Sequence, residues 1–244
     1  MSIAERTYEG SELTLFRDAI NWKSYLFGFL APYLKGDRML EVGSGLGGNV
    51  PHYAHLSPDI SLLEPDGDLI AASKRFTSGC GEHLQHVQGT TGSLSADVIR
   101  DGFDVILYSD VLEHIEDAVA EVARAAALLR PGGRLIVVVP AYPALFSEFD
   151  AAIGHYRRYT RRMLRSEFEK GFPEGRILAL RHLEAVGVFP SLLNKLLLRQ
   201  SAPTPAQVKM WDTWMVPVSR ALLDPLVRGT FGKSVIGVIE KPAS

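Results

Sequence analysis

The feature that most constrains the fold of this chain is a short apolar strand that runs directly into a cluster of glycines. Residues 39–42 are Met-Leu-Glu-Val, and Gly43, Gly45, Gly47 and Gly48 follow at once. Glycine has no Cβ and adopts backbone angles that other residues avoid, so such a loop lets a ligand lie close to the main chain. Gly43, Gly45 and Gly48 also satisfy the spacing of a dinucleotide-binding turn. The loop therefore predicts a nucleotide-like ligand but does not choose among cofactors.

Short apolar runs alternate with helical periodicity along most of the chain, which indicates an α/β protein. A helix is expected over residues 18–34, where apolar residues recur three and four positions apart. Further helices are expected over 118–129 and after Thr160. The expected strands are residues 39–42, 60–63, 103–107, 134–139, 176–183 and 234–240, with a long insert at 187–230 before the last of them.

Composition narrows the class of protein. The 244 residues suit one α/β domain with additions. Lys plus Arg number 26 and Asp plus Glu 28, so no dominant nucleic-acid surface is expected. The single cysteine, Cys80, excludes an internal disulfide. Residues 1–10 contain no apolar core of a signal peptide, so a cytoplasmic location is expected. The sequence offers no support for peripheral membrane contact and assigns no oligomeric state.

Acidic residues at two strand ends narrow the choice of ligand. Glu41 lies inside an otherwise apolar strand, where a charge needs backbone donors or a ligand cation. Glu64 ends the second strand, where a carboxylate can accept both hydroxyls of a ribose. A solvated turn acid is the alternative for Glu64. The strand at 103–107 then runs into Ser-Asp-Val-Leu-Glu-His at 109–114.

Taken in order, these segments resemble the class I S-adenosylmethionine-dependent methyltransferases. The matching stretches are residues 40–47, 63–66, 103–106 with 109–114, and 129–135. The resemblance covers residues 38–140. It implies a doubly wound, mostly parallel seven-stranded sheet of Rossmann-like type with an antiparallel last strand pair. It also implies one domain over 1–244, with a cofactor-binding core at 38–140 and acceptor-side lid elements at 141–171 and 187–230.

The resemblance implies S-adenosylmethionine as the cofactor. The glycines and the Ser44 backbone would line its methionine part, and Glu64 would hold its ribose. Ser109 and Asp110 would lie under the sulfonium, with His114 closing the site. The family usually has an acid near the adenine; here Gly89 and Thr90 replace it, so a hydroxyl or backbone contact is expected. The expected cofactor residues are Glu41, Gly43, Ser44, Gly45, Glu64, Pro65, Asp66, Gly89, Thr90, Ser109, Asp110 and His114.

A basic and aromatic run after the fifth strand is the candidate acceptor site. Residues 155–159 are His-Tyr-Arg-Arg-Tyr, close to the expected carboxyl edge of the sheet. His155 is the first candidate for a general base, because a neutral imidazole is available near pH 7. His114 and Asp150 follow it. A similar run occurs in bacterial methyltransferases associated with glycosyltransferases, which suggests a glycosylated or lipid-linked acceptor. A solvated basic face is the alternative.

The insert at 187–230 is more apolar than an exposed insert should be. Its apolar residues include Phe189, Leu192, Leu193, Leu196, Leu197, Trp211 and Trp214. We expect a lid with an apolar wall and a cationic rim, and the alternative is that these residues pack as core or as a dimer interface. The expected acceptor-binding residues are Tyr156, Arg157, Tyr159, Trp211 and Trp214.

Other chemistries fit the sequence less well. None of the eight tyrosines has a lysine four residues later, as a short-chain dehydrogenase requires. The pairs His52/His55 and His83/His86 have metal-compatible spacing but no accompanying ligand set, so no metal is expected. The Gly-Lys-Ser at 232–234 lacks the upstream glycine of a phosphate-binding loop.

The sequence thus predicts transfer of a methyl group from S-adenosylmethionine to a small-molecule acceptor, through oxygen, nitrogen or carbon. The main alternative is a scaffold subunit of a glycan or natural-product assembly complex that binds the cofactor without catalysis. An RNA or protein methyltransferase is disfavoured by the net charge and by the absence of an Asn-Pro-Pro-Tyr-like motif after the fourth strand.

Overall fold

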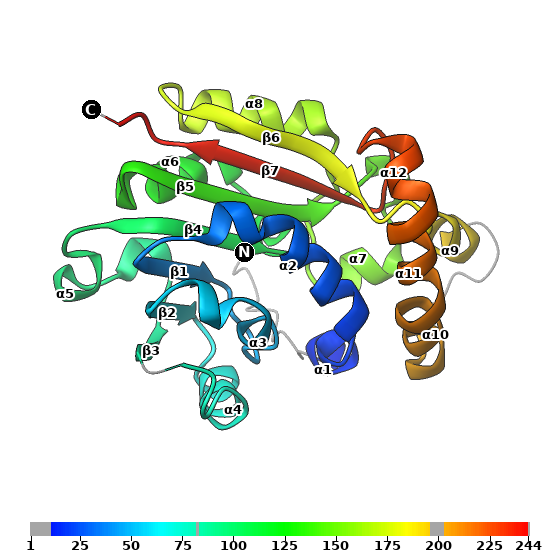
Figure 1. Cartoon of the computed structure of the whole chain (residues 1–244), viewed down its shortest axis with the longest axis horizontal. Coiled ribbons are helices and arrows are strands. Elements are labelled where there is room, and N and C mark those ends of the chain that lie inside the picture. The colour runs from blue at the N-terminus through cyan, green and yellow to red at the C-terminus, as the bar shows by residue number, and fades with distance from the viewer. Residues whose placement is uncertain (1–10, 82, 196–202, 244) are drawn as a thin grey trace, which may run out of the picture.

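A computed structural model describes residues 11–81, 83–195 and 203–243 of the chain. Its seven-stranded sheet has the order β3-β2-β1-β4-β5-β7-β6 (Figure 1). Strands β1 to β5 are parallel, and β7 is antiparallel to both β5 and β6. The strands are β1 (Arg38–Val42), β2 (Asp59–Glu64), β3 (His83–Gln88), β4 (Phe103–Ser109), β5 (Leu129–Pro140), β6 (Arg176–Leu183) and β7 (Ser234–Glu240). The doubly wound sheet expected from the sequence is confirmed.

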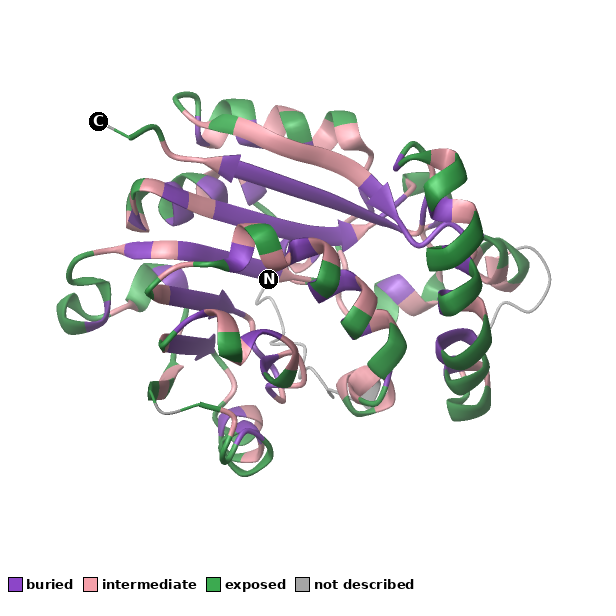
Figure 2. Ribbon diagram, viewed as in Figure 1, coloured by how far each residue is buried: buried purple, intermediate pink, exposed green. Residues whose placement is uncertain are grey.

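Helices cover both faces of the sheet, because side chains alternate along each strand. Leu40 and Val42 of β1 join an apolar cluster with α6 and α8, whereas Met39 joins a second cluster with α2 and α3. The central strands are buried along most of their length (Figure 2). The helices on the sheet are α2 (Ile20–Leu34), α3 (Val50–Tyr53), α4 (Gly67–Phe76), α5 (Ala96–Ile99), α6 (Ala118–Leu128) and α8 (Arg161–Gly171).

The remaining helices gather beyond the carboxyl end of the sheet. They are α1 (Ser11–Arg17), α7 (Glu148–Ala152), α9 (Val188–Leu193), α10 (Pro205–Met210), α11 (Val216–Val218) and α12 (Asp224–Val227). Two π-helical segments, Trp211–Met215 and Ser219–Leu223, join α10, α11 and α12 into one helix. Val208, Trp211 and Val216 of this helix pack on Ala19, next to α2. This is the helical insert expected before the last strand.

Two elements differ from the sequence expectation. β3 was not expected, because its residues alternate between exposed and half-buried and carry no apolar run. It is an edge strand, paired only with β2 among the described strands. β5 begins at Leu129 and not at Arg134, so the Pro-Gly-Gly at 131–133 lies inside it. Lys241 explains this, because its O accepts from Gly132 N at 3.0 Å and its N donates to Gly133 O at 2.8 Å.

Within the described residues, we find no helix that combines the length and the apolar character needed to cross a membrane.

Candidate active site

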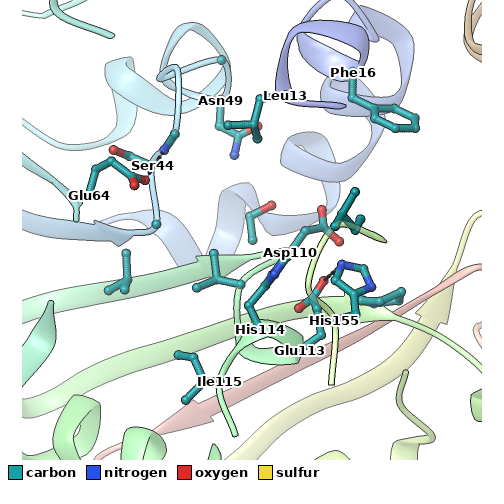
Figure 3. Close-up of a pocket in the computed structure, with 18 of the residues that line it drawn as sticks. Leu13, Phe16, Ser44, Asn49, Glu64, Asp110, Glu113, His114, Ile115 and His155 are labelled. Atoms are coloured by element: carbon teal, nitrogen blue, oxygen red, sulfur yellow. Dashed lines mark hydrogen bonds and ion pairs between the residues drawn. The ribbon is translucent and has the colours of Figure 1, made fainter. Parts of the chain in front are cut away.

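A cavity of about 790 Å³ opens at the carboxyl ends of β1, β2 and β4. It lies where the strand order reverses, between β1 and β4, which is where ligands bind in open α/β sheets. Its wall also includes residues of α1 and α2, the segment 149–158, and Trp211. Figure 3 shows Ser44 and Glu64 at one end, and Asp110, Glu113 and His155 at the other. The volume is within the range of cofactor sites, roughly 300–1,000 Å³.

The glycine loop after β1 forms one wall of this cavity. Gly43 and Gly45 have φ angles of +64° and +51°, in the region that favours glycine. A Cβ on Gly43 would lie 2.6 Å from Val111 Cγ2, so the loop admits no larger residue there without a shift. The amides of Gly43 and Ser44 donate to Leu63 O at 2.8 and 3.1 Å. Gly43, Ser44 and Gly45, all expected from the sequence, line the cavity.

Glu64 at the end of β2 ties two segments of the site together. Its Oε2 accepts from Gly45 N at 2.9 Å, and its Oε1 accepts from Asp66 N at 3.1 Å. Burial raises the pKa of this carboxyl, although the two backbone hydrogen bonds act in the opposite direction. Asp66 in turn caps α4, accepting from the amides of Asp68 and Leu69. Glu64, Pro65 and Asp66 line the cavity as expected.

Glu41 takes a different place from the one expected. Its side chain is buried and does not line the cavity. Asn49 Nδ2 donates to Glu41 Oε1 at 2.8 Å, and the Tyr53 hydroxyl donates to Oε2. The partners are therefore side chains beneath the glycine loop, not backbone donors or a ligand. This corrects the assignment of Glu41 to the cofactor set, since it supports the loop from below.

The loop after β3 completes the cofactor end of the cavity. Gly89 and Thr90 line it, as expected, together with Thr91 and Gly92. The Thr91 hydroxyl donates to Glu121 of α6 at 2.8 Å, so this hydroxyl already has a hydrogen-bond partner. Backbone groups of this loop and the Thr90 side chain remain the nearest substitutes for the missing acid.

The segment after β4 brings four polar side chains into the cavity. Ser109, Asp110 and His114 line it, as expected, and so does Glu113, which the sequence analysis did not select. Asp110 has a φ of +55° and its amide donates to Val138 O at 2.9 Å, which fixes the turn. Burial raises the pKa of Asp110, while Lys233 and His155 oppose that shift.

Glu113 is fully buried, and neither carboxylate oxygen has a hydrogen-bond partner within the described chain. Burial and the charge of Asp110 raise its pKa well above the usual value. Its Oε1 lies 3.8 Å from His155 Nε2. A buried carboxyl without partners is costly, so this arrangement indicates a functional role. The signal was available, because Glu113 belongs to the motif at 109–114.

His155 is held in place by Asp150. Its Nδ1 lies 2.9 Å from Asp150 Oδ1, which also accepts from Arg158 Nε at 2.7 Å. Ser147 donates to Oδ2 of the same carboxylate through both its amide and its hydroxyl, each at 2.8 Å. Burial would raise the pKa of Asp150, but the hydrogen bonds from His155 and Arg158 hold it well below its usual range. Asp150 thus lies beside His155 in a position to orient its ring.

His114 meets His155 edge to face, with ring centroids 4.5 Å apart. Burial and the neighbouring His155 lower the pKa of His114 to about 4. Glu113, His114 and His155 each offer a ligand atom, and these atoms lie within 4.8 Å of one another. This is a metal-compatible set that the sequence analysis did not identify, because it weighed only the other histidine pairs. His52 instead stacks on Phe27.

The residues expected to bind the acceptor divide into two groups. Trp211 lines the cavity, and Lys233 Nζ lies 3.9 Å above its ring centroid. Tyr156, Arg157, Tyr159 and Trp214 do not line it.

Local contacts place three of the four residues outside the cavity, and the fourth, Trp214, is largely exposed. Tyr159 is buried, and its amide donates to Pro140 O at 2.8 Å. Arg157 donates to Glu116 O at 2.6 Å and faces outward over the ring of Tyr156. Trp214 is 70% exposed. The structure thus places none of these four residues in the cavity lining.

The rest of the expected lid is only partly supported. Arg158 and Lys233 are among the basic residues that line the cavity, whereas Arg157 does not line it. Phe189, Leu192 and Leu193 are exposed and lie outside the cavity lining. Leu196 and Leu197 lie outside the described residues. Lys233 belongs to the Gly-Lys-Ser at 232–234, which the sequence analysis rejected as a phosphate-binding loop. To select Lys233 from the sequence, one would have had to know that β7 starts at the cavity.

The sheet order and the glycine loop at the switch point define a Rossmann-like fold. Residues 40–135 match a family described as methyltransferase domain. A ubiquinone biosynthesis O-methyltransferase from Bradyrhizobium sp. (strain ORS 278) is 30% identical over 125 residues, 51% of this chain and 48% of that protein. The chain thus spans about half the length of that curated relative. Residues 40–135 are thus similar to methyltransferase domains.

Solved structures agree in fold across nearly the whole chain. A geranyl diphosphate methyltransferase in complex with S-adenosylmethionine gives a TM-score of 0.61 at 14% identity, covering 98% of this chain and 93% of the other. The N-methyltransferase NodS from Bradyrhizobium japonicum WM9, in complex with S-adenosyl-L-homocysteine, gives 0.57 at 12% identity, covering 92% and 88%. The shared architecture therefore extends beyond residues 40–135.

Proposed function

We propose that this protein binds S-adenosylmethionine in the 790 Å³ cavity and transfers its methyl group to a small-molecule acceptor. One observation carries the proposal. A single cavity joins the glycine loop and Glu64 at one end to a histidine, His155, that Asp150 orients at the other. Segments 141–171 and 187–230 are the acceptor-side elements of this single domain.

The described residues fit the cofactor. The space beside Gly43 is closed to any side chain, and the backbone of Gly43 to Gly45 borders the cavity directly. Glu64 would accept the hydroxyls of the ribose, and Asp110 would lie beside the methionine part of the cofactor. S-adenosylmethionine supplies an activated methyl group on a sulfonium. The protein has mainly to align the acceptor with it, which by effective-molarity arguments lowers the barrier by about 7–11 kcal/mol.

His155 is the proposed general base. Asp150 holds Nδ1, so Nε2 is the atom left to accept a proton from an acceptor hydroxyl. The acceptor oxygen becomes the nucleophile as the proton moves to Nε2. His114, with a pKa of about 4, is neutral at pH 7 and adds no charge that would oppose this transfer. The name O-methyltransferase of the relatives supports an oxygen acceptor.

The acceptor side combines an aromatic wall with two cations. Trp211 offers an apolar face, and Lys233 and Arg158 lie in the same cavity. An acceptor with an apolar body and an anionic or sugar group would match both features. A lipid-linked or glycosylated acceptor, which the sequence suggested, remains within this class.

Calorimetry with S-adenosylhomocysteine and NAD tests the cofactor assignment. We expect micromolar or tighter binding of S-adenosylhomocysteine, a Kd that corresponds to about 8 kcal/mol, and no measurable heat with NAD. Tight binding of NAD with no response to S-adenosylhomocysteine would overturn the assignment.

The cluster of Glu113, His114 and His155 sets up a second test. If these residues held a divalent cation, His155 Nε2 would be a ligand and not a base. We expect turnover to survive dialysis against a chelator. Loss of turnover on chelation with recovery on adding Mg²⁺ or Zn²⁺ would replace His155 as the base by metal-assisted activation of the acceptor.

A further inference from the structure

Lys233, just before β7, differs from the other basic residues of the cavity. Among the described residues, the lysines and arginines that line the cavity are Arg17, Lys23, Arg124, Arg158 and Lys233. The three arginines each pair with an acid of the chain, and Lys23 donates to two backbone oxygens. Within the same described part of the chain, Lys233 Nζ has neither a hydrogen-bond acceptor nor an ion-pair partner.

The ammonium of Lys233 lies between two aromatic rings of the cavity wall. Its Nζ is 3.9 Å from the ring centroid of Trp211 and 5.9 Å from that of Phe16. The stem of the side chain passes close to Gly187, where a Cβ would lie 2.8 Å from Lys233 Cδ. These contacts hold the ammonium inside the cavity and next to apolar surface.

The aromatic contacts do not satisfy this ammonium. A ring face attracts a cation, but it does not replace acceptors for three N–H donors. Burial lowers the pKa of Lys233, while the charges of Glu184 and Asp110 favour its protonated form from beyond ion-pair distance. A buried ammonium without acceptors is costly, so its surroundings lack an anion that would complete them.

The backbone holds Lys233 where three strand ends meet. Its amide donates to Glu184 O at 2.8 Å, and its own carbonyl accepts from Ala141 N at 2.7 Å. Glu184 and Tyr142 have φ angles of +64° and +65°, which residues other than glycine seldom adopt. Strain of this kind gathers at functional sites. The position of Lys233 is thus fixed by strands β5 and β6 at some conformational cost.

Lys233 lies at the His155 end of the cavity and not beside the glycine loop. Lys233 and His155 both act on the charge of Asp110. Two other cations flank the glycine loop, since a Cβ on Gly48 would lie 2.7 Å from Lys23 Nζ and 3.6 Å from Arg17 Cγ. Those two would meet the carboxylate of a cofactor held by that loop, which leaves Lys233 for a different anion.

We propose that Lys233 binds an anionic group, a carboxylate or a phosphate, on the methyl acceptor. The inference rests on the proposed function, because it concerns the acceptor of that same cavity. A lysine ammonium is a point charge that serves either anion, and Trp211 and Phe16 supply apolar surface for the rest of the molecule. A neutral sugar would leave the ammonium without its anion. Lys233 would bind this group before and during transfer alike, so it contributes to affinity and not to the chemical step.

Ligand-observed NMR titrations of the full chain, saturated with S-adenosylhomocysteine, test the proposal. The probes are benzoate, phenyl phosphate and benzamide, which share a phenyl ring and differ in charge. We expect at least one of the two anions to bind at least about tenfold more tightly than benzamide, as one hydrogen bond to a charged group allows. The tighter anion shows whether the site takes a carboxylate or a phosphate.

Matched variants place the anion at Lys233. Lys233→Met keeps the length and the apolar stem of the side chain and should abolish the preference for the anions, as should Lys233→Gln. Lys209→Met removes the charge of an exposed lysine on α10 and should bind the probes as the unmodified chain does. A melting temperature no lower than that of the unmodified chain shows that a variant is folded, and we expect its affinity for S-adenosylhomocysteine to be unchanged.

Three results would overturn the proposal. The first is equal affinity of the unmodified chain for the anions and for benzamide. The second is a preference for the anions that both Lys233 variants retain. The third is at least about tenfold weaker binding of S-adenosylhomocysteine in folded Lys233→Met, which would assign the lysine to the carboxylate of the cofactor.

A failure of the proposed function gives a different result. In that case the unmodified chain would not bind S-adenosylhomocysteine at all. The titrations are therefore repeated without S-adenosylhomocysteine, so that the preference for an anion at Lys233 is measured independently of cofactor binding.

Discussion

At the scale of single residues, the chemistry proposed here depends on the pair Asp150–His155. His155→Ala should lower turnover by about 10²–10⁴-fold, the usual contribution of a general base, and leave cofactor affinity nearly unchanged. Steady-state rates and calorimetry measure the two effects separately. The exposed His55→Ala serves as the control. Full turnover in His155→Ala with a defined acceptor would remove His155 from the base role.

Glu64 is the residue on which cofactor affinity should depend most. Glu64→Ala should weaken S-adenosylhomocysteine binding by about 1.5–3 kcal/mol, the range for hydrogen bonds to a charged group. The melting temperature should fall slightly as well, because Gly45 N and Asp66 N lose their acceptor. Calorimetry with S-adenosylhomocysteine on the folded variant measures the loss of affinity. Unchanged affinity would place the ribose contact elsewhere, with Asp66 as the next candidate.

The two buried acids beside His155 should respond to pH in opposite directions. The pKa of Asp150 is depressed, so its stabilising contribution is present above its unfolded pKa of about 3.9 and is lost as the pH falls further. The pKa of Glu113 is raised, so its contribution is full below about 4.3 and is lost as the pH rises toward its folded value.

Urea unfolding measured from about pH 3 to about pH 8 tests the direction of both pH dependences. Asp150→Asn should be less stable than the unmodified chain at neutral pH, with the gap closing in acid. Glu113→Gln should match the unmodified chain in acid and become the more stable of the two as the pH rises. Gaps that do not change with pH would contradict the assigned charge states.

At the scale of elements, Asp212 is the attachment point of the helix at 205–227. Ala19 offers no side-chain cap to α2, and Asp212 accepts from the Asn21 and Trp22 amides in its place. Asp212→Ala should lower the free energy of unfolding by about 1.5–3 kcal/mol, measured by urea denaturation. Asp18→Ala, on an exposed side chain nearby, should change it by less than about 0.5 kcal/mol. Equal losses in the two variants would refute the capping role.

Elements with strong apolar periodicity could be predicted from the sequence, and those held by distant partners could not. β1, β4 and β7 carry nearly continuous apolar runs, because neighbours cover them on both faces. β3 is a polar edge strand, and the start of β5 depends on Lys241, more than a hundred residues away. The π-helical segments depend on prolines whose effect a helical periodicity does not encode.

The same distinction holds within the site. Gly43, Glu64 and Ser109 occupy fixed offsets from strand ends, so their places follow from local sequence. Arg157 and Tyr159 are close to His155 in sequence, but of these three only His155 lines the cavity, because Tyr159 pairs with Ala141 just after the end of β5. Adjacency in an irregular segment does not predict which side chain faces a ligand.

At the scale of the whole molecule, the cavity is a joint product of three parts of the chain. The sheet edge supplies the cofactor end, the segment 149–158 supplies His155, and the N-terminal helices and Trp211 close the remaining side. Residues 40–135, the part that matches the methyltransferase domain family, do not include the segment 149–158, the N-terminal helices or Trp211. We therefore expect the acceptor to be selected mainly by residues outside the matched region.

The most direct test of the central claim is transfer of a labelled methyl group. The purified chain is incubated with tritiated S-adenosylmethionine and with polar, lipid and protein fractions of a cell extract. We expect label in one small-molecule fraction, matched in amount by S-adenosylhomocysteine and absent with His155→Ala. Binding of S-adenosylhomocysteine without incorporation in any fraction would contradict catalysis and favour a cofactor-binding scaffold.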